Sequence, residues 1–176
     1  MTTAFRPHGP AAATPWPLLA VIGAADAEGA LAEVAEAVGR AAAAHGHGVV
    51  CGGHGGVMAA ACRGARAGGA PTVGILPGAE ADEANRWVDI AVPTGLGEAR
   101  TALVVRAGVA VVAVGGGWGT LSEIALARKM GRRVVGLATW QPAPPEGMAE
   151  PGVEPAGSAE EAVARALGVG PFGARG

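Results

Sequence analysis

The sequence predicts an α/β protein whose single domain is built on a doubly wound, mostly parallel sheet of about six or seven strands, with helices on both faces. A chain of 176 residues is long enough for one substantial hydrophobic core and too short for two. Short, continuous apolar runs alternate with segments in which apolar residues recur at helical spacing. Two of these runs are followed at once by clusters of glycine, where the backbone would turn from strand to helix.

The folded domain is expected to span residues 18–168, where this alternating pattern is found. Residues 1–17 are rich in proline, alanine and threonine without periodicity, so they predict a disordered arm, and residues 169–176 predict a tail. Within the domain, the segment Gln141–Gly157 contains five prolines and no periodic pattern, which predicts a surface linker.

Apolar runs bounded by turn residues predict six strands, and the stretches of helical periodicity predict the helices. The polar segment Pro77–Arg86 predicts a loop or a short helix. In this Rossmann-like order the carboxyl ends of the strands share one edge of the sheet, where ligands bind. The strands are expected at Leu18–Gly23, Gly48–Cys51, Pro71–Leu76, Trp87–Val92, Val109–Val114 and Arg133–Ala138. The helices are expected at Glu28–Ala44, Val57–Ala67, Gly97–Ala107, Trp118–Met130 and, capped by Ser158 with Glu161, up to Leu167.

The stretch after the strand Val109–Val114 is the most informative part of the chain. Three consecutive glycines, Gly115–Gly117, are followed by Gly119 and Thr120, where a helix is expected to begin. An ordinary strand-to-helix turn needs one or two glycines, so four within five residues indicate that a ligand comes close to the backbone. The unpaired amides and the positive end of the helix dipole at such a junction favour a phosphate or carboxylate.

Glu123 has two interpretations. Thr120-x-x-Glu123 is the pattern of a capping box, in which Thr120 caps the helix and Glu123 bonds back to the first turn without any ligand. In the second interpretation, Glu123 lies beside the anion at the sheet edge and takes part in its chemistry. The sequence leaves both interpretations open.

The helix expected at Gly97–Ala107 also starts at this edge of the sheet. The residues at positions i, i+3, i+4 and i+7 on one of its faces are Arg100, Leu103, Val104 and Ala107. Because Arg100 is nearest the edge, it is expected to point inward over the site. The alternative is an arginine that lies across apolar surface with its charged group in solvent.

Composition and motifs exclude several classes of protein. A net charge of −2 with 16% charged residues and no basic run argues against a nucleic-acid surface. No apolar stretch approaches the length of a membrane span. Cys51 and Cys62 have no paired spacing, so no disulfide and a cytoplasmic location are expected. The chain has no Gly-x-x-x-x-Gly-Lys-Ser/Thr run, and neither glycine cluster spells the dinucleotide fingerprint.

No cofactor and no metal are expected. Pyridoxal phosphate would require a Schiff-base lysine, and Lys129, the only lysine, lies at the far end of its helix. His45, His47 and His54 lie near the two cysteines in sequence, but their spacing matches no common zinc pattern.

The residues around the glycine clusters resemble those of a known superfamily. This superfamily comprises the Lonely Guy-type phosphoribohydrolases, often described as lysine decarboxylase-like, and the short bacterial Rossmann-like proteins related to them. Those hydrolases carry an Arg-Lys pair and then Pro-Gly-Gly-x-Gly-Thr-x-x-Glu, and Arg100 and Gly115–Glu123 match this pattern with the same spacing. The resemblance extends through Gly52–Met58 and covers most of the chain.

By this resemblance, Arg100 and Glu123 are the candidate catalytic residues of a hydrolase that cleaves a nucleoside 5′-monophosphate to free base and ribose 5-phosphate. Glu123 would stabilise positive charge on the sugar, and Arg100 would stabilise or protonate the leaving base. Two departures matter: the lysine of the hydrolases is Thr101 here, and their proline is Gly115. The short subgroup shares the glycine and is similar to molybdenum cofactor carrier proteins. The alternative is therefore a non-catalytic carrier of a pterin phosphate, and a nucleotide sensor would share these features.

The expected ligand is a small phosphorylated molecule, either a nucleotide or a pterin phosphate. The resemblance also predicts a homodimer or higher homo-oligomer, as does the apolar helix Val57–Ala67, which one sheet face would not fully cover. The residues predicted to bind phosphate or nucleotide are Gly23, Gly52, Gly53, Gly55, Gly56, Met58, Gly115, Gly116, Gly117, Gly119 and Thr120.

Overall fold

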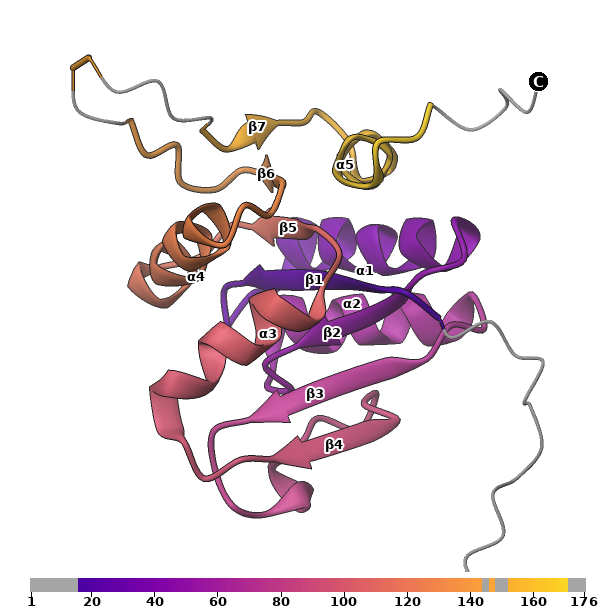
Figure 1. Cartoon of the computed structure of the whole chain (residues 1–176). Coiled ribbons are helices and arrows are strands. Elements are labelled where there is room, and N and C mark those ends of the chain that lie inside the picture. The colour runs from indigo at the N-terminus through magenta and orange to yellow at the C-terminus, as the bar shows by residue number, and fades with distance from the viewer. Residues whose placement is uncertain (1–15, 144–145, 148–151, 171–176) are drawn as a thin grey trace, which may run out of the picture.

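The computed structural model describes residues 16–143, 146–147 and 152–170. Its strands form one sheet of seven parallel strands in the order β4-β3-β2-β1-β5-β6-β7, which confirms the predicted α/β class (Figure 1). The strands are β1 Leu18–Gly23, β2 Gly48–Cys51, β3 Thr72–Leu76, β4 Ile90–Pro93, β5 Val111–Val114, β6 Val134–Leu137 and β7 Glu154–Pro155. The α-helices are α1 Gly29–Ala44, α2 Gly56–Ala67, α3 Thr101–Ala107, α4 Trp118–Lys129 and α5 Ala159–Leu167.

The sheet is doubly wound because strands are added on both sides of the central strand β1. From β1 the chain passes outward to β4, and it then returns to β5, which pairs with the other side of β1, and continues to β7. Figure 1 shows α1, α2 and α5 on one face of this sheet and α3 and α4 on the other. The point where the strand order reverses, between β1 and β5, is where such sheets open a crevice for ligands.

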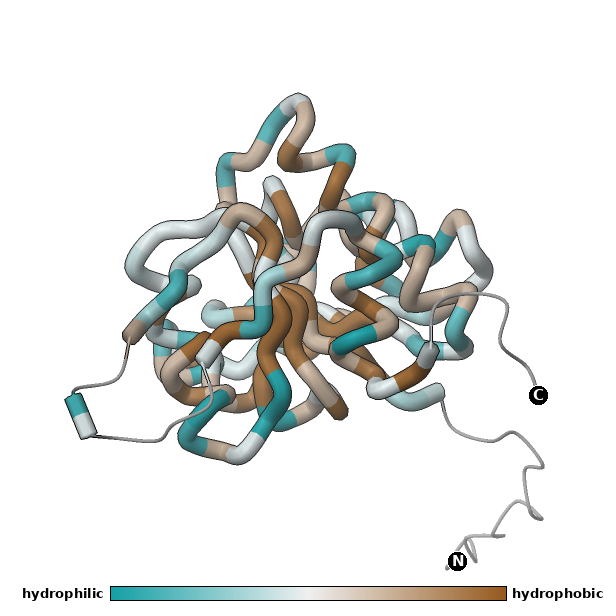
Figure 2. The backbone as a smooth tube through the Cα atoms, turned by 90° about the horizontal axis from the view of Figure 1, so that it is seen from above, coloured by the Kyte–Doolittle hydropathy of each residue, from teal (hydrophilic) through white to brown (hydrophobic). Residues whose placement is uncertain are grey.

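Two layers of apolar side chains hold the helices against the sheet. Successive residues of β1 point to opposite faces, so Leu19 and Val21 pack under α1, α2 and α5, whereas Ala20 and Ile22 pack under α3 and α4. Figure 2 shows the apolar strands as the brown centre of the molecule. Within the described ranges, none of the helices has the length and apolar character needed to cross a membrane.

The ends of the chain lie largely outside the described ranges. Residues 1–15 of the predicted arm and residues 171–176 of the predicted tail are not among the described residues. The backbone carbonyl of Pro17 accepts a hydrogen bond of 2.9 Å from the amide of Gly48, so the hydrogen bonds of the sheet already include the end of the predicted arm.

The linker predicted at Gln141–Gly157 contains a strand that the sequence did not predict. The two residues of β7, Glu154 and Pro155, pair in parallel with β6 and add a seventh strand to the predicted six. Two residues are too few to show any periodicity, so only the neighbouring edge of the sheet makes this segment a strand. The helix that follows begins as predicted, because the Ser158 side chain accepts a hydrogen bond from the Glu161 amide.

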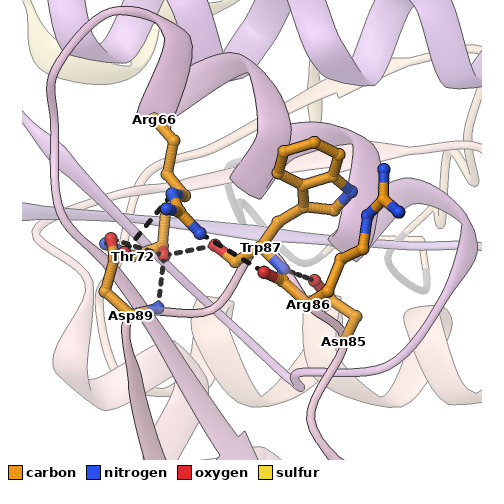
Figure 3. Close-up of polar contacts among 6 residues, drawn as sticks. All are labelled: Arg66, Thr72, Asn85, Arg86, Trp87 and Asp89. Carbon is orange, nitrogen blue, oxygen red and sulfur yellow. Dashed lines mark hydrogen bonds and ion pairs between the residues drawn. The ribbon is translucent and has the colours of Figure 1, made fainter.

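The connection between β3 and β4 has no α-helix of its own and is fastened by polar contacts (Figure 3). Thr72 Oγ1 donates a hydrogen bond of 2.7 Å to the carbonyl of Trp87, and Asp89 Oδ2 accepts one of 3.0 Å from the Thr72 amide. Arg66 of α2 donates to the carbonyl of Arg86 and lies 3.4 Å from the Asp89 carboxylate. These contacts engage residues 87–89, which is why β4 begins at Ile90 and not at Trp87 as predicted.

The helix α2 is covered by its neighbours, so the expectation that its apolar face is left open for self-association is wrong. Its apolar residues are buried against α1, and Gly39 and Gly64 allow the two helix backbones to touch. The exposed apolar residues lie elsewhere. Ile90 and Val92 pair in register with Val73 and Ile75 of β3, so they lie on the face that carries α3. The residues of this apolar face are Ile90, Val92, Leu96 and Leu103, which are between 40% and 54% exposed.

We propose that the homodimer predicted from the sequence forms through this apolar face, because burying four apolar side chains on each copy favours association. Light scattering at micromolar concentration should give twice the monomer mass, and the double variant Ile90→Glu, Val92→Glu should give the monomer mass. Val169→Glu changes an exposed apolar residue outside this face and should leave the mass unchanged. A monomeric native chain would contradict the proposal.

Candidate functional site

A cavity of about 320 Å³ lies at the carboxyl edge of the sheet, over the reversal between β1 and β5. Its wall comes from the loop after β1, the β2–α2 loop, the segment that leads into α3, and the start of α4. The lining residues are Gly23, Ala24, Ala25, Asp26, His54, Met58, Glu98, Arg100, Thr101, Gly117, Gly119, Thr120 and Glu123.

Seven of the residues predicted from the sequence therefore meet at this cavity: Gly23, Met58, Arg100, Gly117, Gly119, Thr120 and Glu123. Among the described residues, the cavity wall does not include the predicted Gly52, Gly53, Gly56, Gly115 and Gly116, and Gly55 instead lines a neighbouring hollow of about 520 Å³ with His54, Glu83 and Asn85. Sequence reasoning missed Ala24, Ala25, Asp26, His54, Glu98 and Thr101. Two signals could have found two of them: Asp26 lies three residues after the first strand, and His54 lies inside a glycine cluster.

The glycines between β5 and the first turn of α4 have two different roles. Gly116 has a φ of 104°, and a side chain there would overlap Thr120, so the loop itself requires this glycine. Gly117 and Gly119 face open space and line the cavity, and their missing side chains leave the start of α4 accessible. The predicted close approach of a ligand therefore concerns Gly117 and Gly119, not the whole cluster.

The helix α4 begins at Trp118, three residues earlier than a Thr120 cap would require. Its N-cap is Gly117, and no side chain caps the helix, so the capping-box interpretation of Thr120 and Glu123 is wrong. The first-turn amides of α4 thus have no side-chain acceptor and lie at the cavity. Unpaired amides at the positive end of a helix dipole are suited to hold an anion.

The helix α2 offers less at the same edge. Its N-cap Gly55 has no side chain to donate or accept, but the amide of Val57 already donates a 2.9 Å hydrogen bond to the carbonyl of Ala24 in the β1–α1 loop. Part of the first turn of α2 is therefore occupied by the protein itself. The start of α4 is the more available anion site.

Arg100 is buried beside the cavity and its guanidinium is incompletely paired. The residue is 8% exposed, and its Nε and Nη1 atoms make no hydrogen bond within the described part of the chain. Glu123 forms an ion pair with it, with Nη1 and Oε1 3.7 Å apart, which is too long for a hydrogen bond. A side chain on Gly52 would come within 2.5 Å of Nη1, so the guanidinium lies directly on that bare backbone.

Arg100 reaches this position by a route different from the predicted one. The segment Gly97–Arg100 forms a tighter 3-10 turn, and α3 begins only at Thr101. This change of winding alters which residues share a face: Leu103 is exposed, whereas Thr101, Val104 and Val105 are buried. The prediction that Arg100 points inward is correct, but the prediction that Leu103 and Ala107 share its buried face is wrong.

The pKa of Glu123 is raised to about 7, mainly because burial penalises the charged carboxylate. The nearby charge of Glu98 raises it further, and Arg100 opposes the shift by stabilising the carboxylate. Near neutral pH, Glu123 therefore exists in both the protonated and the ionised form. A group that titrates at this pH can serve as an acid or a base, and its neutral form lessens repulsion of an anionic ligand.

The β2–α2 loop is fixed by Asn85, from the connection between β3 and β4. Its Nδ2 donates hydrogen bonds of 3.0 and 2.8 Å to the carbonyls of Gly53 and His54, and its Oδ1 accepts one of 3.0 Å from the Trp87 amide. This arrangement places His54 between the cavity and the neighbouring hollow. The described part of the chain contains no group of three histidine, cysteine or carboxylate side chains arranged to hold a metal.

This fold and this site define the class of protein. A model of the SLOG cluster4 family matches residues 17–163, and the chain belongs to this family. The resemblance to the superfamily of the Lonely Guy-type proteins is thereby confirmed, and similarity to molybdenum cofactor carriers is found among solved structures.

The particular relatives are as follows. The molybdenum cofactor binding protein of Rippkaea orientalis is 30% identical, with a TM-score of 0.77 over 89% of this chain and 98% of that one. The molybdenum cofactor carrier protein of Chlamydomonas reinhardtii is 34% identical, with a TM-score of 0.75 over 88% of this chain and 98% of that one. An uncharacterized protein of Archaeoglobus fulgidus is 42% identical over 119 residues, which are 68% of this chain and 78% of that protein.

The raised pKa of Glu123 predicts a pH dependence of stability. The group favours folding most below its ordinary pKa of 4.5, and this contribution is lost as the pH rises through about 7. Urea unfolding should show that Glu123→Gln becomes more stable relative to the native chain between these pH values, by at most roughly 3 kcal/mol. Glu160→Gln, at an exposed carboxylate, should show no such trend. A constant difference between Glu123→Gln and native chain would contradict the burial of an ionisable carboxyl.

Two substitutions of Gly119 are expected to separate the stability of the fold from the binding of an anion. Because Gly119 lies in a helix and faces open space, Gly119→Ala should stabilise the fold by about 0.5–1 kcal/mol. Gly119→Leu should fill the mouth of the cavity and abolish the rise in melting temperature that inorganic phosphate causes in the native chain. Gly116 is unsuitable for this test because its replacement would also displace Thr120. A phosphate-induced rise that survives in Gly119→Leu would place the anion elsewhere.

Proposed function

We propose that this protein binds a phosphorylated pterin of the molybdenum cofactor type and carries it without chemical change. The observation that supports this most is the combination of uncapped α4 amides, bare Gly117 and Gly119, and a buried Arg100 with unfilled donors around one cavity. An anion there would accept hydrogen bonds from Arg100 that the described residues do not accept. Two relatives that this chain matches over 98% of their length are described as binding or carrying molybdenum cofactor, which supports the choice of ligand.

Thr101 supports a carrier more than a hydrolase. At this position the hydrolases that the sequence resembles have a lysine, whose charge could assist a departing base. Here the Thr101 hydroxyl donates a hydrogen bond of 2.9 Å to the carbonyl of Glu98, so it supplies no charge to the cavity. Tight retention of a ligand requires only the anion-binding groups of the cavity, and these groups do not depend on that lysine.

Glu123 and Arg100 support a second candidate function, hydrolysis of a nucleoside 5′-monophosphate to free base and ribose 5-phosphate. The two groups lie 3.7 Å apart at the cavity, so both could contact one bound nucleotide. However, stabilising a cationic sugar requires an ionised carboxylate, and burial raises the pKa of Glu123 to about 7, which favours its neutral form. Protonation of Glu123 suits the binding of an anion better than it suits this chemistry.

The carrier proposal predicts that the protein retains a pterin when it is purified without air from cells that make the molybdenum cofactor. When the bound pterin is released from the native protein and oxidised, its fluorescence should exceed that from the Gly119→Leu variant, because the leucine fills the mouth of the cavity. Incubation with AMP or an N6-prenylated analogue should release no ribose 5-phosphate above that of a blank. Ribose 5-phosphate that the native chain releases and Glu123→Gln does not would favour the hydrolase and defeat the carrier.

A further inference from the structure

Trp118 is the most exposed large apolar side chain in the described part of the protein, at 77%. It is the first residue of α4 and lies in the sequence between Gly117 and Gly119, both of which line the cavity. Scattered exposed apolar residues are common on protein surfaces. This one is distinguished because both residues next to it in the sequence line the cavity of the proposed anion site, while the indole itself lies outside the cavity wall.

A second tryptophan holds Trp118 in place. The ring centroids of Trp118 and Trp140 lie 5.2 Å apart with the planes inclined by 35°. Trp140 Nε1 donates hydrogen bonds of 3.1 Å to the carbonyls of both Gly116 and Gly117. The segment after β6 therefore fixes the aromatic pair to the same glycine loop that leads into α4, and a fixed indole loses little conformational entropy when a ligand binds.

We propose that the Trp118 indole is the stacking surface for the planar heterocycle of the ligand whose phosphate lies at the start of α4. This inference rests on the proposed function, because it needs a ligand that joins a phosphate to a flat ring. An indole presents a large π face to such a ring, and stacking of this kind is tolerant of the ring's substituents. The glycines on either side of Trp118 have no side chains that would obstruct the approach.

The neighbouring hollow at His54, Glu83 and Asn85 is the competing place for the heterocycle. It lies on the opposite side of the cavity, toward β2 and β3. Both amide hydrogens of Asn85 are already donated to the carbonyls of Gly53 and His54. Asn85 therefore has no free donor for a ring edge, and recognition in the hollow would rest on His54 and Glu83. The Trp118 indole is 77% exposed and offers an aromatic face that the hollow lacks.

The test compares ligands with and without a ring. Titration calorimetry would use ribose 5-phosphate, GMP and 6-hydroxymethylpterin phosphate, because the last two share an amino-oxo pyrimidine ring. Trp118→Ala should weaken binding of the two ring-bearing ligands by about tenfold or more and leave the affinity for ribose 5-phosphate unchanged. Trp118→Phe should retain most of the affinity because it keeps an aromatic face. Trp16→Ala, which removes a 44% exposed indole at the opposite edge of the sheet, should change neither.

Other outcomes would overturn the inference. Equal loss of all three ligands in Trp118→Ala would mean that Trp118 only supports the anion site. Unchanged binding of the ring-bearing ligands, with loss in His54→Ala, would place the ring in the hollow. Unchanged binding together with a fall in mass by light scattering would assign Trp118 to a contact with a second copy. Failure of the native chain to bind any of the three ligands would remove the proposed function as well.

Discussion

The burial of an incompletely paired arginine is the constraint on which this site depends. Removing a guanidinium from water is costly unless its donors find acceptors, and Glu123 at 3.7 Å provides charge without a good hydrogen bond. Two local features make this buried position possible: the bare backbone of Gly52 leaves room for the guanidinium, and a 3-10 turn directs Arg100 inward. Such a group is poised for an anionic ligand, which would supply the missing acceptors.

The loops around Arg100 are held by segments that lie far from them in the sequence. Asn85 fixes the β2–α2 loop through two backbone carbonyls, and Thr139 and Trp140 fix the β5–α4 loop through three hydrogen bonds to glycine carbonyls. The connection that carries Asn85 is in turn fastened at its other end by Thr72 and Asp89. A cradle fixed in this way gains affinity because little order remains to be imposed on binding.

The geometry of the site is relevant both to a ligand carrier and to a hydrolase. An anion cradle with a cationic partner is needed for both, and the difference lies in what the nearby groups can do as charge develops. Here the residue beside Arg100 is the neutral Thr101, and the buried carboxyl of Glu123 is held partly protonated near neutral pH. Both features favour a bound ground state over a cationic transition state, and they support the proposal that this member of the SLOG cluster4 family is a carrier.

The sequence by itself determined the parallel sheet, most of the elements and the edge at which the site lies, because short-range periodicity and glycine clusters report backbone geometry directly. It could not distinguish two similar patterns. Ser158-x-x-Glu161 caps α5, whereas Thr120-x-x-Glu123 lies inside α4, since the positive φ of Gly116 turns the chain so that this helix starts earlier. The tertiary structure alone decided the pairing of β7 with the sheet edge, the pairing of Arg100 with Glu123, and the position of the two tryptophans. Each depends on contacts between distant segments, which leave no local pattern in the chain.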